Sequence, residues 1–198
     1  MNPQTRTATV ERKTGETDIL LTLTLDGGGT SDVRTGIPFF DHMLTLFARH
    51  GLLNLTVAAK GDIEVDYHHT VEDTGIALGQ ALARALGDKA GIRRYGHVYV
   101  PMDEALVRAV VDCSGRPFLA YEAPRGVEAI GLFPFQLVEE FLRAVAVNAG
   151  LTLHVSVLAG RDAHHMAEGV FKALGRAIDA AVTIDGRVSG IPSTKGVL

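Results

Sequence analysis

Two copies of a paired-histidine motif are the residues of this chain best suited to chemistry. The first copy is His68-His69-Thr70-Val71-Glu72, and the second is His164-His165-Met166-Ala167-Glu168. On a helix, the first histidine and the glutamate of each copy lie four residues apart and share one face. The second histidine points about 100° away from that face. Each copy therefore offers a His/Glu pair to one ion and a lone histidine to another, so two packed copies could complete two sites.

The chemistry of these side chains indicates a first-row divalent metal. Imidazole and carboxylate groups suit manganese, iron, zinc or nickel, whereas a thiolate site is excluded because Cys113 is the single cysteine. Mixed nitrogen and oxygen ligation favours six-coordinate Mn²⁺ or Fe²⁺, and Zn²⁺ is the competitor. One His/Glu pair alone would suit a solvated helix face, but its repetition argues against that alternative.

The sequence that precedes the motifs also repeats, and it supplies two further candidate ligands. Asp41-His42-Met43-Leu44 comes before the first copy, and Glu139-Glu140-Phe141-Leu142 comes before the second at a similar distance. We therefore expect His42 and Glu140 to be the fourth ligands, with Asp41 orienting the ring of His42. The alternative for Glu140 is a surface acid beside Glu139.

The repeat predicts an α+β fold that arose by internal duplication. Beyond each motif, matching residues recur at one offset, such as Gly79 with Gly175 and Leu82 with Ile178. We expect one domain over residues 1–198, with similar halves over about 1–90 and 91–184 and a C-terminal tail over 185–198. Each half is predicted to run strands, helix, strand, helix, with sheets on one side of the fold and helices on the other.

Hydrophobic periodicity and turn residues give the expected bounds of these elements. Strands are expected over 7–14, 18–25, 53–59, 95–100, 105–112, 118–121 and 152–158. Helices are expected from Pro38 to His50, over 70–86, from Pro134 to Asn148 and over 163–182. The glycine-rich segment 26–30 lacks the Gly-Lys-Ser/Thr end of a phosphate loop, which favours the turn of a β-hairpin.

Several cationic and hydroxyl residues outside the motifs could bind an anion. Lys172 is predicted to lie on the helix face of His164 and Glu168, where it would repel a metal unless an anion lay between them. The other candidates for a phosphate site are Arg94, Arg116, Ser193 and Lys195. The alternative is that the arginines are solvated and the tail is disordered.

Composition narrows the class of protein. A net charge of −4 with no evident basic patch argues against a nucleic-acid partner, and a hydrophobic content of 46% supports a full core. No apolar run approaches the roughly 20 residues of a membrane span, and the N-terminal residues lack a signal-peptide core. With the single Cys113, these features predict a cytoplasmic protein in a reducing compartment.

Six segments together resemble the imidazoleglycerol-phosphate dehydratase family of histidine biosynthesis. They are HHTVED (68–73), HHMAE (164–168), PFFDHML (38–44), PMDEAL (101–106), SGRP (114–117) and IPSTKGVL (191–198). The resemblance covers nearly the whole chain in order. It implies two α+β halves like the second domain of ribosomal protein S5, and a shell of 24 subunits with active sites at subunit interfaces.

The resemblance also implies two Mn²⁺ ions per active site and the loss of water from imidazole glycerol phosphate, giving imidazole acetol phosphate. One ion is expected on His42, His68, Glu72 and His165. The other is expected on His69, His164, Glu168 and residue 140. In most members that residue is a histidine, whereas this chain has Glu140; a Gln common near the substrate is replaced by Leu46.

By the same resemblance, Glu16 matches the family's acid/base carboxylate, and Asp103 holds the matching place in the second half. The residues that match substrate- or phosphate-binding positions are Glu16, His50, Arg94, Arg116, Lys172, Ser193 and Lys195. Two other functions are alternatives to the dehydratase. A dinuclear metal phosphohydrolase would use the same metals and cations, and a metal-storing shell would not need Glu16 or Lys195.

Overall fold

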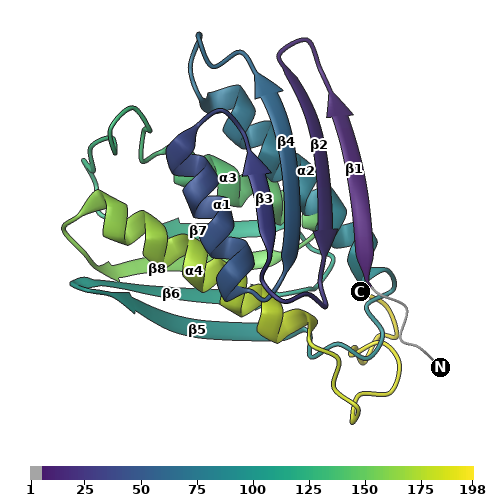
Figure 1. Cartoon of the computed structure of the whole chain (residues 1–198). Coiled ribbons are helices and arrows are strands. Elements are labelled where there is room, and N and C mark those ends of the chain that lie inside the picture. The colour runs from purple at the N-terminus through teal and green to yellow at the C-terminus, as the bar shows by residue number, and fades with distance from the viewer. Residues whose placement is uncertain (1–5) are drawn as a thin grey trace.

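The computed structural model describes residues 6–198. Residues 1–5, which belong to the N-terminal stretch without a signal-peptide core, lie outside the described residues. The described chain forms two similar halves, each with a four-stranded sheet and two helices (Figure 1). The first half contains β1 (Thr7–Lys13), β2 (Thr17–Thr24), β3 (Ser31–Arg34), α1 (Pro38–His50), β4 (Asn54–Gly61) and α2 (His68–Leu86). The second contains β5 (Tyr95–Met102), β6 (Ala105–Asp112), β7 (Phe118–Glu122), α3 (Leu137–Ala149), β8 (Thr152–Ala159) and α4 (Ala163–Val182).

The two sheets share one topology, which confirms the predicted α+β class and the internal duplication. The strand orders are β1-β2-β4-β3 and β5-β6-β8-β7. The hairpin expected at 26–30 is therefore wrong, because β4 inserts between β2 and β3. In each sheet the first two pairings are antiparallel and the last, β3 with β4 or β7 with β8, is parallel. Alternate residues of β2 and β6 are buried, as a half-buried strand requires.

The helices lie between the two sheets rather than on one side of the whole fold (Figure 1). Within each half they cover one face of the sheet, as predicted. Across the halves, however, α2 packs on α3 and α1 packs on α4. The expected arrangement of sheets on one side and helices on the other therefore holds for each half only. The correction has a simple cause, because the outer faces of both helical layers are apolar and are buried against each other.

Close packing between the helical layers depends on two glycines that the repeat relates. A Cβ atom on Gly79 of α2 would lie 2.8 Å from the carbonyl oxygen of Val145 on α3. A Cβ atom on Gly175 of α4 would lie 2.4 Å from the carbonyl oxygen of Phe47 on α1. Both distances are shorter than a van der Waals contact, so these positions require glycine for the helices to approach this closely.

The third helix begins later than the sequence suggested. We expected it to start at Pro134, but α3 starts at Leu137. The segment before it is a tight turn, in which Leu137 N–H donates to the Pro134 carbonyl and Val138 N–H donates to the Phe135 carbonyl. Such i to i+3 bonds are typical of a 3₁₀-like turn at a helix N-terminus, where proline is tolerated but does not begin the α-helix proper.

The C-terminal ends of α2 and α4 converge on the tail that follows α4. The loop after α2 pairs with the end of α4 through Arg93 N–H to the Thr183 carbonyl and Arg94 N–H to the Ala181 carbonyl, both 2.9 Å. The tail is held to the same loop by a 2.8 Å bond from Gly91 N–H to the Gly190 carbonyl. At 1.5 Å per residue, the N-terminal motif of each helix is therefore about 25 Å along the helix from this junction.

Asp73 links β1, β2 and α2 inside the first half. Its Oδ1 accepts hydrogen bonds of 2.9 and 2.7 Å from the guanidinium of Arg12 on β1. Its Oδ2 accepts one from Thr17 at the start of β2. Asp73 and Thr17 are both buried. This network fixes the helix that carries the first histidine motif against its own sheet.

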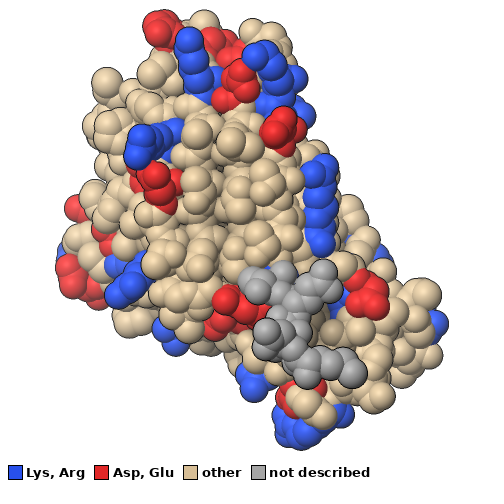
Figure 2. Space-filling model, turned by 45° about the vertical axis from the view of Figure 1, so that its right-hand side comes forward, with Lys and Arg blue, Asp and Glu red and all other residues tan. Residues whose placement is uncertain are grey.

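Charged groups of both signs are interspersed on the surface seen in Figure 2, which is the view of Figure 1 turned by 45°. Lysine and arginine side chains lie close to aspartates and glutamates on this face. The ion pairs of the described chain include Arg6–Asp26 and Lys13–Asp18. No helix in the described part of the chain is long and apolar enough to cross a membrane.

We expect the Asp73→Ala substitution to lower the free energy of unfolding by about 2–4 kcal/mol, because it leaves Arg12 and Thr17 without their buried acceptor. Asp18→Ala is the matched control: it removes an aspartate from an exposed pair with Lys13 and should cost less than about 1 kcal/mol. Urea denaturation of both variants measures the difference. Equal losses would show that the Asp73 network contributes no more than a surface pair.

The Gly175→Ala substitution should lower the free energy of unfolding by about 1–3 kcal/mol, because the new methyl group collides with the backbone of α1. Gly186→Ala is the control, since a Cβ atom there meets nothing within 4 Å. Thermal unfolding of the two variants, compared with the parent protein, gives the answer. A Gly175→Ala protein as stable as the Gly186→Ala protein would refute the close-packing argument.

Candidate metal centre

An aspartate begins each motif helix and fixes the backbone of the histidine pair. Asp162 caps α4, where its Oδ1 accepts hydrogen bonds of 2.7 and 3.2 Å from the backbone N–H groups of His164 and His165. Ahead of α2, the side chain of Asp66 accepts a 2.7 Å bond from His68 N–H. Such bonds satisfy N–H groups that have no partner within the helix. Both histidine pairs are therefore held at the first turn of a helix.

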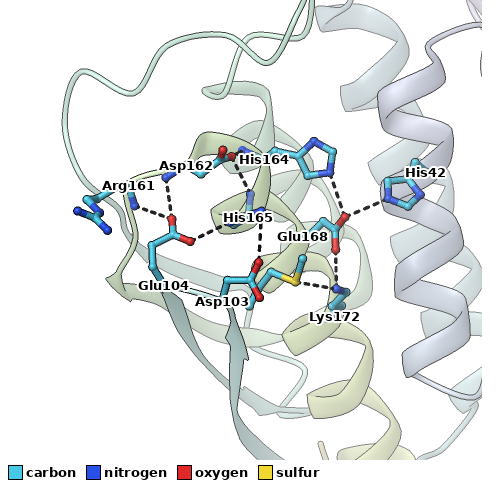
Figure 3. Close-up of polar contacts among 10 residues, drawn as sticks. His42, Asp103, Glu104, Arg161, Asp162, His164, His165, Glu168 and Lys172 are labelled. Atoms are coloured by element: carbon cyan, nitrogen blue, oxygen red, sulfur yellow. Dashed lines mark hydrogen bonds and ion pairs between the residues drawn. The ribbon is translucent and has the colours of Figure 1, made fainter.

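His42, His164 and Glu168 form a three-residue group that could hold a metal ion. The Oε1 atom of Glu168 lies 3.1 Å from His42 Nε2 and 3.0 Å from His164 Nε2, and all three ligand atoms lie within 4.8 Å of one another. Figure 3 shows His164 and Glu168 turned toward His42 on α1. Two imidazoles and one carboxylate suit Mn²⁺, Fe²⁺ or Zn²⁺. The donor set and its convergence therefore fit a divalent ion with further coordination positions left for other ligands.

The neighbours of His42 within one chain come from the second motif. The resemblance assigns His42 to one ion with His68, Glu72 and His165, whereas in this chain its side chain lies beside His164 and Glu168. The cause is the helix pairing described above, because α1 packs on α4 and not on α2. The repeat indicated the candidate ligands but could not show which half each one faces.

Lys172 pairs with Glu168 one helical turn below the group. Its Nζ donates a 2.5 Å bond to Glu168 Oε2, and Met102 Sδ lies 3.3 Å from the same Nζ. Burial alone would raise the pKa of Glu168, but hydrogen bonds from Lys172, His42 and His164 outweigh it and hold the pKa at about 2. Glu168 is therefore an anion at neutral pH, as a metal ligand must be.

The first motif presents the same His/Glu pair, but more openly. His68 Nε2 lies 3.7 Å from Glu72 Oε2, and both side chains are nearly half exposed. Glu140 lies in the first turn of α3, the helix that packs on α2. Its neighbour Glu139 pairs with Arg143, whereas no hydrogen bond to the Glu140 carboxylate is found in the described part of the chain. Glu140 thus lies on the helix that packs on α2, as His42 lies on the helix that packs on α4.

The second histidine of each motif turns away from these groups, as the helical spacing predicted. His69 Nδ1 lies 3.0 Å from Asp62 Oδ2, and His165 Nδ1 lies 2.8 Å from Glu104 Oε2. Figure 3 shows His165 directed toward Asp103 and Glu104, on the other side of α4 from His42. The hydrogen bond to Asp62 raises the pKa of His69, and the bond to Glu104 raises that of His165.

The two expected catalytic carboxylates stand in equivalent relations to these histidines. Glu16 Oε1 lies 3.7 Å from His69 Nε2, and Asp103 Oδ2 lies 3.8 Å from His165 Nε2. Both carboxylates are exposed. Asp103 has a positive φ of 47°, a conformation uncommon for residues other than glycine, in the two-residue turn between β5 and β6. Each lone histidine therefore has an exposed acid beside its outward-facing nitrogen.

Asp62 and Glu104 were not among the predicted site residues. The sequence places Asp62 in a turn and Glu104 in the PMDEAL segment, and neither position indicates a contact with a histidine. Asp41, which we expected to orient His42, instead accepts hydrogen bonds of 2.8 and 2.6 Å from the backbone N–H and hydroxyl of Thr35. A carboxylate can contact a histidine from any distance along the chain, so the contact has no characteristic spacing in the sequence. The sequence therefore offers no reason to choose Asp62 over Asp41 as the partner of a histidine.

Apart from Lys172, the residues predicted for a phosphate site gather at the tail, far from the motifs of the same chain. The guanidinium of Arg94 is fully engaged here, because it donates 2.7 and 3.2 Å bonds to Asp112 and a 3.0 Å bond to the Pro192 carbonyl. Arg116 is exposed, with Asp112 3.6 Å away. Ser193 Oγ accepts a bond from Lys195 N–H, so the tail forms an ordered turn. Arg94 thus acts as the clamp that positions this turn.

His50 and Lys172 lie between these two regions, where α1 meets the middle of α4. Burial lowers the pKa of His50, and the nearby charges of Lys172 and Arg176 lower it further. His50 is therefore neutral at pH 7 and can accept or donate a hydrogen bond. Leu46, one turn earlier on α1, packs against the core, and so it offers no polar contact.

A cavity of about 690 Å³ opens beside His164. Its walls are the loop over residues 124–130 and the turn over 160–163, together with His164 and Met166. Arg125 and Arg161 bring positive charge to its lining. The candidate metal group therefore borders a space large enough for a small molecule or for a segment of another chain.

Comparison with known proteins places this chain in a family. The family model for imidazoleglycerol-phosphate dehydratase matches residues 35–178. The imidazoleglycerol-phosphate dehydratase of Moorella thermoacetica is 63% identical over 195 residues, covering 98% of each chain. That of Thermoanaerobacter pseudethanolicus is 61% identical over 193 residues, covering 98% of this chain and 100% of the relative.

Solved structures of the same enzyme share the fold. The dehydratase from Staphylococcus aureus superposes with a TM-score of 0.82 at 42% identity, covering 90% of this chain and 99% of the other. The Pyrococcus furiosus enzyme, solved with a bound compound, gives a TM-score of 0.83 at 35% identity, covering 96% and 100%. The chain therefore belongs to the imidazoleglycerol-phosphate dehydratase family, hydro-lyases of histidine biosynthesis.

Proposed function

We propose that this chain dehydrates imidazole glycerol phosphate to imidazole acetol phosphate with two divalent metal ions, and that each active site is completed between copies of the chain. The observation that carries the metal part is the convergence of His42 and His164 on Glu168, with Nε2 to Oε1 distances of 3.1 and 3.0 Å. Mn²⁺ is the ion that we propose, because two imidazoles and a carboxylate leave room for six-coordinate geometry.

The proposed ligand sets follow the helix pairing. One ion is held by His42, His164 and Glu168, with His69 of another copy. The other is held by His68, Glu72 and Glu140, with His165 of another copy. This scheme keeps the expected sharing of the lone histidines but exchanges His42 and Glu140 between the two ions. It is supported by the packing of α1 on α4 and of α3 on α2.

Two features support a site that is shared between copies. The ligand side chains His42 and His164 are 47% and 44% exposed, so the group is open toward a neighbour. The tail with Ser193 and Lys195 follows the C-terminal end of α4, whereas the motifs lie at the N-terminal ends of α2 and α4. About 25 Å of helix separates the two ends, which is too far for one small substrate to bridge. A second copy can bring its tail to the metal ligands of the first. The proposed assembly is the 24-subunit shell of the family.

Different groups of the site would then bind the imidazole ring, the reacting carbons and the phosphate of the substrate. Bound metal ions would supply Lewis acidity to the imidazole ring and hold it in place. Glu16 and Asp103, each next to an outward-facing histidine nitrogen, are placed to accept and return protons of the reacting carbons. Arg116, Ser193, Lys195 and Lys172 offer donors for the phosphate, while Arg94 holds the tail in position.

A cytoplasmic location belongs to the same proposal. Cys113 is buried, and burial raises the pKa of its thiol to about 12, so it is an unreactive packing residue. A free, buried thiol is the form expected in a reducing compartment.

Adding Mn²⁺ to metal-free protein should switch on the reaction. Protein stripped with a chelator should leave imidazole glycerol phosphate unchanged, and the added ion should restore formation of the ketone product. The measurement is product analysis by mass spectrometry, with inorganic phosphate assayed in the same sample. Release of phosphate would favour a phosphohydrolase, and turnover that does not depend on metal would contradict the proposed site.

Glu16→Gln should lower kcat by about 10²- to 10⁴-fold while leaving Mn²⁺ binding intact, because it removes a proton acceptor and not a ligand. Glu11→Gln, at an exposed position on the neighbouring strand β1, is the matched control and should keep full activity. Steady-state kinetics with saturating Mn²⁺ checks both variants. A Glu16→Gln protein of normal kcat would remove this residue from the proposed chemistry.

A further inference from the structure

Each lone histidine of the two motifs lies between two carboxylates. In the first half, His69 Nδ1 is 3.0 Å from Asp62 and its Nε2 is 3.7 Å from Glu16. In the second half, His165 Nδ1 is 2.8 Å from Glu104 and its Nε2 is 3.8 Å from Asp103. The close contact is at Nδ1 in both cases, and only this contact is a hydrogen bond.

The hydrogen bond at Nδ1 fixes which ring nitrogen is free. An ionised carboxylate can only accept, so Nδ1 must carry the hydrogen that it donates. In a neutral ring, Nε2 then holds the lone pair, and a metal can bind only there. Glu104 is itself immobilised, because its Oε1 accepts 3.1 and 2.8 Å bonds from the backbone N–H groups of Arg161 and Asp162 (Figure 3).

The two halves provide the Nδ1 contact from different places in the fold. Asp62 comes directly after β4, in the loop that connects β4 to α2. Glu104 lies in the turn between β5 and β6, next to Asp103. A contact inherited passively from the duplication would come from the same element in both halves. Different elements supply a carboxylate to Nδ1 of both histidines. This indicates that the contact has a role in orienting the histidine and is not a by-product of local packing.

We propose that Asp62 and Glu104 are positioning residues that fix the tautomer and ring orientation of His69 and His165, so that each ring presents Nε2 to a metal ion. They touch neither the substrate nor the metal. This inference rests on the proposed metal-binding function of the two motifs. Carboxylates that hold a ligating histidine in this way are worth about 10- to 100-fold in metal affinity.

The test is a titration of metal-free protein with Mn²⁺, in which electron paramagnetic resonance reads the free ion. Asp62→Ala and Glu104→Ala should each weaken one of the binding steps by about 10- to 100-fold. Glu64→Ala is the control, because Glu64 is exposed on the same loop as Asp62 and should leave both steps unchanged. Circular dichroism and light scattering confirm that each variant keeps its fold and its assembly size.

A double substitution separates positioning from a general structural role. If Asp62 acts through His69, adding Asp62→Ala to His69→Ala should change Mn²⁺ affinity by no more than about twofold. A full further loss in the double variant would overturn the inference, as would single variants that bind Mn²⁺ like the parent protein. A parent protein that binds no Mn²⁺ would overturn the proposed function as well, so the two failures can be told apart.

Discussion

The direction of two helices is the constraint on which the rest of this structure depends. In α2 and α4 the C-terminal ends are joined through the loop that contains Arg93 and Arg94, while the N-terminal ends carry the histidine motifs. A helix is rigid, so metal ligands and the tail are kept about 25 Å apart in one chain. Duplication placed the same motif on both helices, and their fixed direction keeps either motif from reaching the tail of its own chain. Sharing between copies is the geometric solution that we propose.

Electrostatics in the candidate metal group follows from this arrangement. Glu168 is mostly buried and would favour its neutral form, yet it faces Lys172 and two imidazoles and stays ionised. In the absence of metal, Lys172 supplies the positive charge that the carboxylate needs. A metal bound to Glu168 would leave Lys172 with less negative charge to balance, and this would favour an anion such as a phosphate nearby. The spacing of His164, Glu168 and Lys172 on one face therefore agrees with our proposal that the metal group and the phosphate of the substrate lie close together.

The sequence predicted those parts of the fold and site that depend on local spacing. The 3.6-residue period located the motif helices, alternation located β2 and β6, and the repeat singled out His42, His164 and Glu168, which converge in the structure. It could not show that α1 faces α4, because that depends on long-range packing through Gly79 and Gly175. For the same reason Asp62 and Glu104 were missed, and Asp41 was assigned to a histidine that it does not contact. Contacts between distant segments depend on the assembled core and leave no period in the sequence.

Mixed assemblies test most directly whether two copies build each site. A chain carrying His69→Ala and a chain carrying His165→Ala should each be inactive when assembled alone. Co-expressed in equal amounts, the two variants should regain about one quarter of the parent activity. Random assembly gives about that share of sites an intact first motif from one copy and an intact second motif from its neighbour. Activity no higher than that of either variant alone would contradict the account, because it would mean that one chain supplies both motifs to its site.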